Sequence, residues 1–263
     1  MIIEQIWTDN ALRNFNYLIA CEETGEAVAI DPLDSTQCLQ RAKQHGWNIT
    51  TIINTHEHGD HTGGNLELIR QTGAKVLAHA GAKGRIPGMT TGLSAGDIVS
   101  LGKTVEITIL DTPGHTMSHV CMLVQSDEPA LFSGDTLFNA GAGNCHNGGN
   151  PAILYKTFCE QLADLPDSTR IYPGHEYLGN NLRFSLDREP GNRAAAELLE
   201  NSANMDPNRA LVTTWGLEKR INPFLRLSKP GIIAKLHQEF PQLAKQSDPK
   251  TVFLKLRELR NRW

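Results

Sequence analysis

Residues 55–61 read THEHGDH, and this short stretch concentrates side chains that bind metal ions. It contains three imidazoles and two carboxylates, although the chain of 263 residues has only ten histidines. Side chains two residues apart in an extended loop point to the same side, so His56 and His58 can grip one ion. Asp60 and His61 enter the turn that follows, where they would be directed to a second position. The stretch by itself predicts a metal site.

Three more segments present a histidine or an aspartate directly after an apolar run. They are Asp111-Thr-Pro-Gly-His115, Gly134-Asp135 and Pro173-Gly174-His175. Loops at one edge of a rigid sheet are where sites are built, because the scaffold fixes the geometry while the loop carries the side chains. We therefore expect the four segments to meet. The candidate ligands are His56, His58, Asp60, His61, His115, Asp135 and His175.

Five imidazoles and two carboxylates are too many for one tetrahedral ion and suit two, with Asp135 as the natural bridge. This mixture of nitrogen and oxygen donors leaves the choice among zinc, iron and manganese open. Two dications would outweigh Asp60, Asp135 and one hydroxide by a single positive charge, which would stabilise an anionic transition state. A bound metal also lowers the pKa of water from 15.7 to about 7. The pattern predicts a metal-dependent hydrolase with Asp60 and Asp135 in its catalytic centre.

The elements that must position these residues follow from the alternation of short apolar runs with Gly-rich turns. Expected strands are 17–20, 27–30, 51–54, 75–78, 105–111, 120–124, 130–133 and 170–172. Expected helices are 35–45, 66–71 and 153–165, and then 193–201, 231–240 and 249–261, where β-branched residues thin out. The pattern indicates layered sheet covered by helices, with a C-terminal helical segment. We expect a boundary near residue 178.

Composition excludes several classes of function. A formal net charge of −4 gives no attraction to nucleic acid or to an anionic membrane. The five cysteines show no paired spacing, which argues against a disulfide framework. The first residues lack the pattern of a signal peptide, and no apolar run approaches the roughly 20 residues of a membrane helix. We expect a cytoplasmic enzyme that acts on a small molecule.

The arrangement T-H-x-H-x-D-H, followed by PGH, GD and GHE, resembles the metallo-β-lactamase superfamily. Within it, the chain is similar to glyoxalase II, the hydroxyacylglutathione hydrolases. The closer similarity lies in SGDTLFNAG (133–141), YPGHEY (172–177), EPGN (189–192) and EKRINPFLR (218–226). The resemblance implies an αββα metallo-β-lactamase sandwich with a C-terminal α-helical segment. Residues 1–178 would form the catalytic domain, and residues 179–263 a helical substrate-binding domain.

The resemblance also implies a binuclear site and a reaction. One divalent ion would be held by His56, His58 and His115, and the other by Asp60, His61 and His175, with Asp135 bridging. Zinc is favoured, with iron and manganese as alternatives. A metal-bridging hydroxide would attack the thioester of S-D-lactoylglutathione and release D-lactate and glutathione. His119 is expected to hydrogen-bond to the site rather than to ligate.

The chain departs from the family at the residues that are expected to contact glutathione, which is the thiol carrier of the substrate. Members usually carry a basic residue and an aromatic residue where this chain has Asn144 and His146. Tyr177 fits the expected tyrosine. Near the end, Arg257 is kept and Arg260 replaces a lysine, and a guanidinium can grip a carboxylate with two hydrogen bonds. The competing interpretation is that these arginines form a solvated basic helix end.

Two other activities stay open at this point. A persulfide dioxygenase of the same superfamily would use a single iron, but such enzymes generally lack a tail carrying EKRINPFLR. A hydrolase of another thioester or of a lactone would explain the departures at Asn144 and His146. The oligomeric state is undetermined by the sequence, and we favour a monomer.

Overall fold

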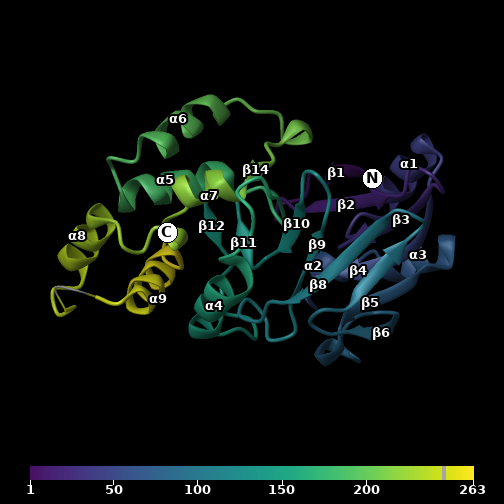
Figure 1. Ribbon diagram of the computed structural model, residues 1–263, viewed down its shortest axis with the longest axis horizontal. Helices are drawn as coiled ribbons and strands as arrows, with labels where there is room; N and C mark the ends of the chain where they lie inside the picture. The colour runs from purple at the N-terminus through teal and green to yellow at the C-terminus, as the bar shows by residue number, and fades with distance from the viewer. Residues whose placement is uncertain (245–246) are drawn as a thin grey trace.

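Two mixed β-sheets form the centre of the computed structural model, which describes residues 1–244 and 247–263 (Figure 1). The first has the strand order β1-β2-β3-β4-β5-β6, which are Ile2–Trp7, Phe15–Ala20, Glu26–Ile30, Asn48–Asn54, Lys75–His79 and Met89–Leu93. The second has the order β14-β13-β10-β9-β8-β7, which are Thr213–Thr214, Arg170–Pro173, Ala130–Gly134, Val120–Val124, Val105–Asp111 and Ile98–Leu101. β3 pairs in parallel with β4, and β10 with β13. Parallel pairing brings the carboxyl ends of these strands to a shared edge.

The main core lies between the two sheets. In β8, Val105, Ile107 and Ile109 are buried while Glu106 and Thr108 are not, which is the alternation of a strand with one face on a core. Aromatic rings join the sheets across this core. The T-shaped contacts of Tyr17 are with Phe132, at 5.2 Å between ring centroids, and with Tyr172, at 5.6 Å.

Helices cover the outer face of each sheet. Helices α1 (Ser35–His45) and α3 (Asn65–Thr72) bury Cys38, Ala42 and Leu68 against the first sheet. Helix α4 (Pro151–Thr157) continues into a π-helical turn, Phe158–Leu162, and both pack on the second sheet. The αββα layering predicted from the sequence is confirmed.

A helical region follows the second sheet and lies at one end of the molecule (Figure 1). It contains α5 (Leu178–Arg188), α6 (Arg193–Ser202), α7 (Trp215–Ile221), α8 (Pro230–Glu239) and α9 (Pro249–Arg260). Trp215 and Phe253 share a core cluster with Leu154 and Phe158 of the main domain. A short hairpin, β11 (Leu137–Phe138) and β12 (Gly141–Ala142), runs between the second sheet and this region. The tail is thus packed onto the sandwich.

The element predictions succeed where apolar residues mark the buried positions, and they fail where few positions are buried or where polar residues occupy them. The strands 105–111 and 120–124 and the helix 35–45 are confirmed at both ends. β6 and β7 were not predicted, because most of their residues are outside the core. Helix α5 was also missed, because polar residues such as Asn181 and Ser185 stand on its buried face and hide the apolar period. In the described part of the chain, no helix combines the length and apolarity needed to cross a bilayer.

Candidate metal centre

The seven predicted ligands converge where the carboxyl ends of strands from both sheets meet. His56 and His58 follow β4, and Asp60 and His61 lie in the short helix α2 (Gly59–Thr62). The loops after β8, β10 and β13 bring the remaining three. Ligand atoms within 4.8 Å of one another form three overlapping groups: His56, His58 and His115; His56, His61 and Asp135; and Asp60, His61 and His175.

Distances inside the groups match those between the vertices of small coordination polyhedra. His58 Nδ1 lies 2.9 Å from His56 Nε2 and 3.1 Å from His115 Nε2. In the second group, His175 Nε2 lies 3.3 Å from His61 Nε2 and 3.5 Å from Asp60 Oδ2. Donors about 2.0–2.1 Å from a tetrahedral zinc would stand roughly 3.3 Å apart. Two cation-sized positions therefore lie side by side.

Asp135 stands between the two positions. Its Oδ2 lies 3.5 Å from His115 Nε2 and 3.3 Å from His175 Nε2, so it faces both groups. Its Oδ1 is buried and has no hydrogen-bond donor among the described residues. A Cβ added at Gly174 would overlap this oxygen, so only glycine permits the approach. An orphaned buried carboxylate oxygen fits a bridging ligand, because a cation would satisfy it.

Hydrogen bonds fix which nitrogen of each imidazole is free in the first group. His58 Nε2 lies 3.1 Å from the carbonyl oxygen of Asn147, and His115 Nδ1 lies 2.7 Å from that of Asn144. A carbonyl can only accept, so these nitrogens carry the hydrogens and the opposite nitrogens carry lone pairs. Lone pairs converging at about 3 Å repel unless a cation lies between them. The arrangement therefore fits a metal ion.

Electrostatics of the site also favour ligation. Burial lowers the pKa of His56 well below its usual value and lowers that of His115, so both imidazoles are neutral at pH 7. Burial alone would raise the pKa of Asp135, but His175, His61 and His115 hold it well below the usual value. Burial lowers the pKa of His61, yet the surrounding carboxylates raise it to about 9. A cation at the same place would compete with that proton.

The sequence analysis missed Asp31, which supports both groups. Its Oδ2 lies 2.8 Å from His61 Nδ1 and accepts the hydroxyl hydrogen of Thr55 at 2.6 Å. The Thr55 oxygen is then free to accept from His56 Nδ1 at 2.9 Å. Asp31 directly follows β3, so the rule that identified the other strand-end residues would have found it. A carboxylate behind a ligating histidine orients the ring and raises its basicity.

The loop before β2 also contributes, and no sequence signal marks it. The carbonyl oxygen of Leu12 lies 2.7 Å from His175 Nδ1, and the amide of Asn14 donates to Asp60 Oδ2 at 3.1 Å. A backbone carbonyl carries no side-chain signature, so only the structure reveals it. The expectation for His119 is confirmed: this buried ring accepts a hydrogen bond from the Asp135 N–H at 3.3 Å and belongs to none of the candidate ligand groups.

A pocket of about 260 Å³ lies beside the metal centre. Phe138, Ala142 and Asn261 form part of its wall. The rest of the wall consists of the five predicted substrate contacts, which are Asn144, His146, Tyr177, Arg257 and Arg260. The ring of Tyr177 stacks on that of His175 at 4.9 Å, which connects the pocket to the metal centre.

The two arginines of the pocket differ in what they contact. Arg257 is 4% exposed, and its Nη1 donates to the carbonyl oxygens of Ala142 at 2.5 Å and Gly143 at 3.1 Å. Burial lowers the pKa of Arg257 to about 10. Its Nη2 forms no hydrogen bond within the described residues. Arg260 is half-buried and donates to Asn181. The interpretation of a solvated helix end is therefore wrong for Arg257, whereas Arg260 is partly exposed and lines the pocket.

Comparisons with known proteins cover the whole chain. A model described as "Metallo-beta-lactamase superfamily" matches residues 14–175, and one described as "Hydroxyacylglutathione hydrolase C-terminus" matches residues 176–263. A hydroxyacylglutathione hydrolase of Nitrosococcus oceani is 64% identical over 263 residues, which is 100% of both chains. The crystal structure of ETHE1 from Myxococcus xanthus has a TM-score of 0.68 at 27% identity and covers 99% of this chain and 98% of that chain. The crystal structure of TTHA1623 in a di-iron-bound form has a TM-score of 0.60 at 26% identity and covers 84% of this chain and 99% of that chain.

Proposed function

Because this chain belongs to the hydroxyacylglutathione hydrolase family, we propose that it hydrolyses S-D-lactoylglutathione to D-lactate and glutathione. It is a metal-dependent thioester hydrolase with the metallo-β-lactamase fold. The observation that carries the proposal is the double set of converging donor atoms, with Asp135 between them, beside a pocket that contains two arginines. A metal centre alone would not select one thiol carrier over another, and the pocket alone would not hydrolyse the thioester.

We assign one divalent ion to His56, His58 and His115 and the other to Asp60, His61 and His175, with Asp135 shared. When bound, such ions supply hydroxide from water at neutral pH and stabilise the oxyanion of an acyl-transfer reaction. Zinc is our preferred metal because neutral imidazoles and carboxylates in small polyhedra suit it, with iron or manganese as alternatives. Leu12, Asp31 and Asn144 keep the imidazoles in the ligating tautomer.

The chain's own residues would bind the glutathione part in the adjoining pocket. Arg260 lies at the wall and offers charge to a carboxylate, and Arg257 contributes its remaining Nη2 hydrogens. Tyr177 lies between these arginines and the metal centre and would place the thioester. Asn144 and His146 are exposed at the rim of the pocket, where Asn144 would contact the carrier through an uncharged amide. We therefore assign catalysis to residues 1–178 and the charged contacts of substrate binding to residues 179–263, with Asn144, His146 and Tyr177 completing the pocket from the first region.

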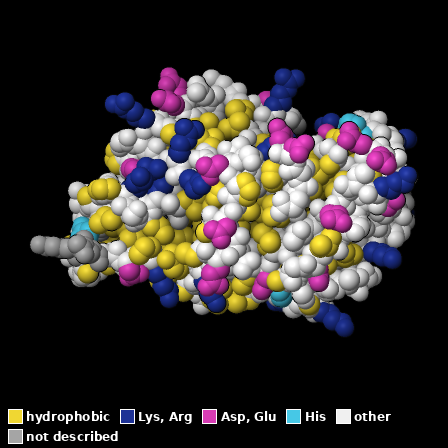
Figure 2. Space-filling model, in the orientation of Figure 1, with side chains coloured by type: hydrophobic (Ala, Val, Ile, Leu, Met, Phe, Trp, Pro, Cys, Tyr) yellow, Lys and Arg dark blue, Asp and Glu magenta, His cyan; other side chains and the backbone are white. Residues whose placement is uncertain are grey.

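Two alternatives are weaker on this geometry. A persulfide dioxygenase with a single iron needs two histidines and one aspartate, which leaves four converging ligand-type side chains without a use. A hydrolase of another thioester or a lactone keeps the metal centre but not the pocket assignment, and the departures from the family at Asn144 and His146 favour testing it. We also propose a cytoplasmic monomer. Figure 2 shows basic and acidic side chains interspersed over the visible face, which offers no basic field for nucleic acid.

The test is a panel of thioesters on metal-replete protein, with release of free thiol as the readout. The panel contains S-D-lactoylglutathione, a coenzyme A thioester of the same acyl group and a lactone monitored by pH. We expect about two metal ions per chain and the highest kcat/KM for S-D-lactoylglutathione. One iron per chain with oxygen uptake on glutathione persulfide would overturn the hydrolase assignment, and a faster coenzyme A thioester would overturn the carrier.

A further inference from the structure

The hairpin β11–β12 forms one wall of the pocket and receives most of its support from the helical tail. Phe138 and Ala142 line the pocket, and the turn between them is Asn139–Ala140. Ala140 adopts φ of +56°, a left-handed conformation that costs a non-glycine residue roughly 1 kcal/mol. Something other than local preference must therefore hold this turn.

Five consecutive residues, 139–143, in the hairpin and directly after it bind tail side chains through their backbone. The carbonyl of Asn139 accepts from Asn181 at 2.9 Å, and the N–H of Ala140 donates to Glu218 Oε2 at 2.8 Å. The carbonyl of Gly141 accepts from Asn222 at 3.0 Å, and the next two carbonyls accept from Arg257. Among these contacts, the one to Ala140 acts on the strained residue itself.

Glu218 is the centre of this network. It is fully buried at the start of the EKRINPFLR stretch, and its Oε1 accepts the hydroxyl hydrogen of Thr213 at 2.7 Å. The Thr213 oxygen in turn accepts from the side chain of Asn139 at 2.8 Å. The amide of Asn222 donates to Glu218 Oε2 at 3.1 Å. One carboxylate thus joins both residues of the turn to helix α7.

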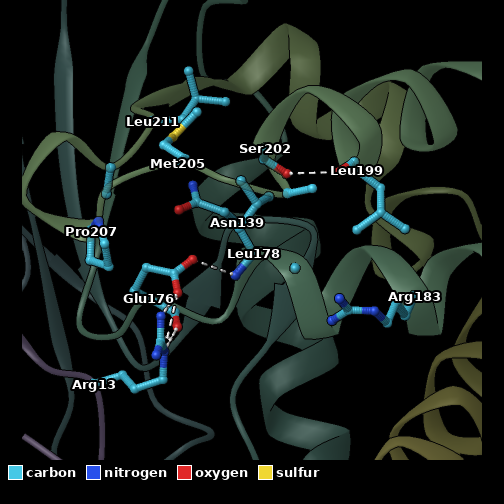
Figure 3. Close-up of a pocket in the computed structure, with 13 residues that line it drawn as sticks. Arg13, Asn139, Glu176, Leu178, Arg183, Leu199, Ser202, Met205, Pro207 and Leu211 are labelled. Carbon is cyan, nitrogen blue, oxygen red and sulfur yellow. Dashed lines mark hydrogen bonds and ion pairs between the residues drawn. The ribbon is translucent and has the colours of Figure 1, made fainter.

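On the side of Asn139, the turn borders a cavity and has less packing to support it. Asn139 faces a cavity of about 190 Å³ between α5, α6 and the segment 203–211, whose walls include Leu178, Leu199 and Met205. Figure 3 shows Asn139 among the residues that line this cavity. On its other side, Ala140 is fully buried and packs with Leu182, Ala195 and Ile221, so the polar contacts act together with this apolar packing.

Asp135 is anchored separately, by the main domain. Its N–H donates to His119, and the hydroxyl of Thr136 donates to the carbonyl of Thr112 at 3.3 Å. The metal-ligating end of the segment and the pocket-forming end therefore have different supports. A change at Glu218 should move the pocket wall and leave the metal centre in place.

We propose that Glu218 is a positioning residue that sets the shape of the thiol-carrier pocket by holding the left-handed turn at Ala140. The proposal rests on the proposed function for the identity of the substrate. Burial raises the pKa of Glu218 to about 7 in spite of hydrogen bonds from Thr213, Ala140 and Asn222. Burying this charge costs folding free energy. We therefore assign Glu218 the role of fixing the positions of the groups that it binds, rather than that of stabilising the fold.

The test compares Glu218→Gln with Glu189→Gln. Glutamine keeps the size of Glu218 but replaces one acceptor oxygen with a donor amide. Glu189 is also in the tail, where it pairs with Arg226 at 2.6 Å, and it makes no hydrogen bond to the hairpin. We expect Glu218→Gln to raise KM for S-D-lactoylglutathione by about tenfold, with kcat within about twofold and metal content unchanged. Glu189→Gln should leave KM unchanged.

Amide hydrogen exchange of Ala140 and Gly141 gives a readout that does not need the substrate. Exchange should accelerate by about tenfold in Glu218→Gln and not in Glu189→Gln. If the wild type fails to hydrolyse S-D-lactoylglutathione, the proposed function is wrong, and the exchange comparison still decides the role of Glu218. Unchanged exchange, an unchanged KM in an active enzyme, or equal effects of both substitutions would overturn the proposal.

Discussion

The metal centre and the thiol-carrier pocket are neighbours, but different parts of the chain support them. At the metal centre, the imidazoles are oriented by oxygen atoms of the main domain, such as those of Asp31 for His61 and Leu12 for His175. At the pocket, side chains of the helical tail reach across to the backbone of residues 139–143. The first support is built from strand ends, whereas the second depends on docking of the tail.

This difference separates chemistry from selection of the substrate. Changes in the strand-end loops should reduce metal content and kcat together, because ligands and their hydrogen-bond partners are packed in one buried network. Changes in the tail should act mainly on KM, because they move groups that contact the carrier. The predictions that follow test whether the two regions are as independent as their hydrogen bonds indicate.

Removing the shared carboxylate should have the largest effect. We expect Asp135→Asn to lower kcat by at least about 10³-fold, because a neutral amide would not bridge two cations, and a metal centre supplies several kcal/mol of transition-state stabilisation. Bound metal should fall below two ions per chain, as measured by elemental analysis. Two bound ions together with activity within tenfold of wild type would contradict the assignment of Asp135.

A second prediction concerns pH and stability in the tail. The folded-state pKa of Glu218 is raised from the usual 4.5 to about 7, so the folded protein keeps this proton where the unfolded chain has lost it. The stability that the folded protein gains by keeping this proton is complete below about pH 4.5, and it is lost as the pH rises to about 7. The unfolding free energy of wild type relative to Glu218→Gln should therefore fall by about 2–3 kcal/mol over this range.

Urea titrations of both proteins at pH 5, 6, 7 and 8 would measure that difference. Hydrogen-bond partners of Glu218 are all neutral groups, namely the Ala140 N–H, the Thr213 hydroxyl and the Asn222 amide. A difference in free energy that is independent of pH would show that Glu218 is already ionised at pH 5. It would also mean that the tail holds this carboxylate without a cost to stability.

The third prediction tests a support of the metal centre. Asp31→Asn should lower metal affinity by about 10–100-fold, which is typical for the loss of a carboxylate behind a ligating histidine. Asp34→Asn is the matched control, because Asp34 caps helix α1 nearby and asparagine caps equally well. Equal metal affinities in the two variants would show that Asp31 does not orient the ligands.

The smallest expected effect belongs to the pocket. Arg260→Ala should raise KM by about tenfold and lower kcat far less, because it removes charge that contacts the carrier before and after the reaction alike. Arg262→Ala is the control, since this exposed side chain pairs with Glu258 instead. An unchanged KM in Arg260→Ala would remove the residue from the substrate site. A large loss of kcat would show that the two regions are coupled.

The ligand set could be predicted because its signal is local. Each candidate is a histidine or aspartate placed directly after a buried apolar strand, and such strands end at a common edge. Asp31 carries the same signal and was overlooked. Leu12 carries none, because it acts through a backbone carbonyl that any residue would supply. The pocket residues were predicted by resemblance to a family, and the structure brings all five around one cavity.

The sequence by itself determined a layered sheet covered by helices, seven ligand-type residues and a helical tail, because the pattern of apolar residues and the chemistry at strand ends can be recognised from neighbouring residues. The αββα order of the layers came from the resemblance to a family. Only the tertiary structure decided what the tail does. The contacts of Glu218, Asn222 and Arg257 join positions 78 to 115 residues apart through neutral backbone groups, and such pairings leave no pattern along the chain. They form only when the tail docks on the second sheet.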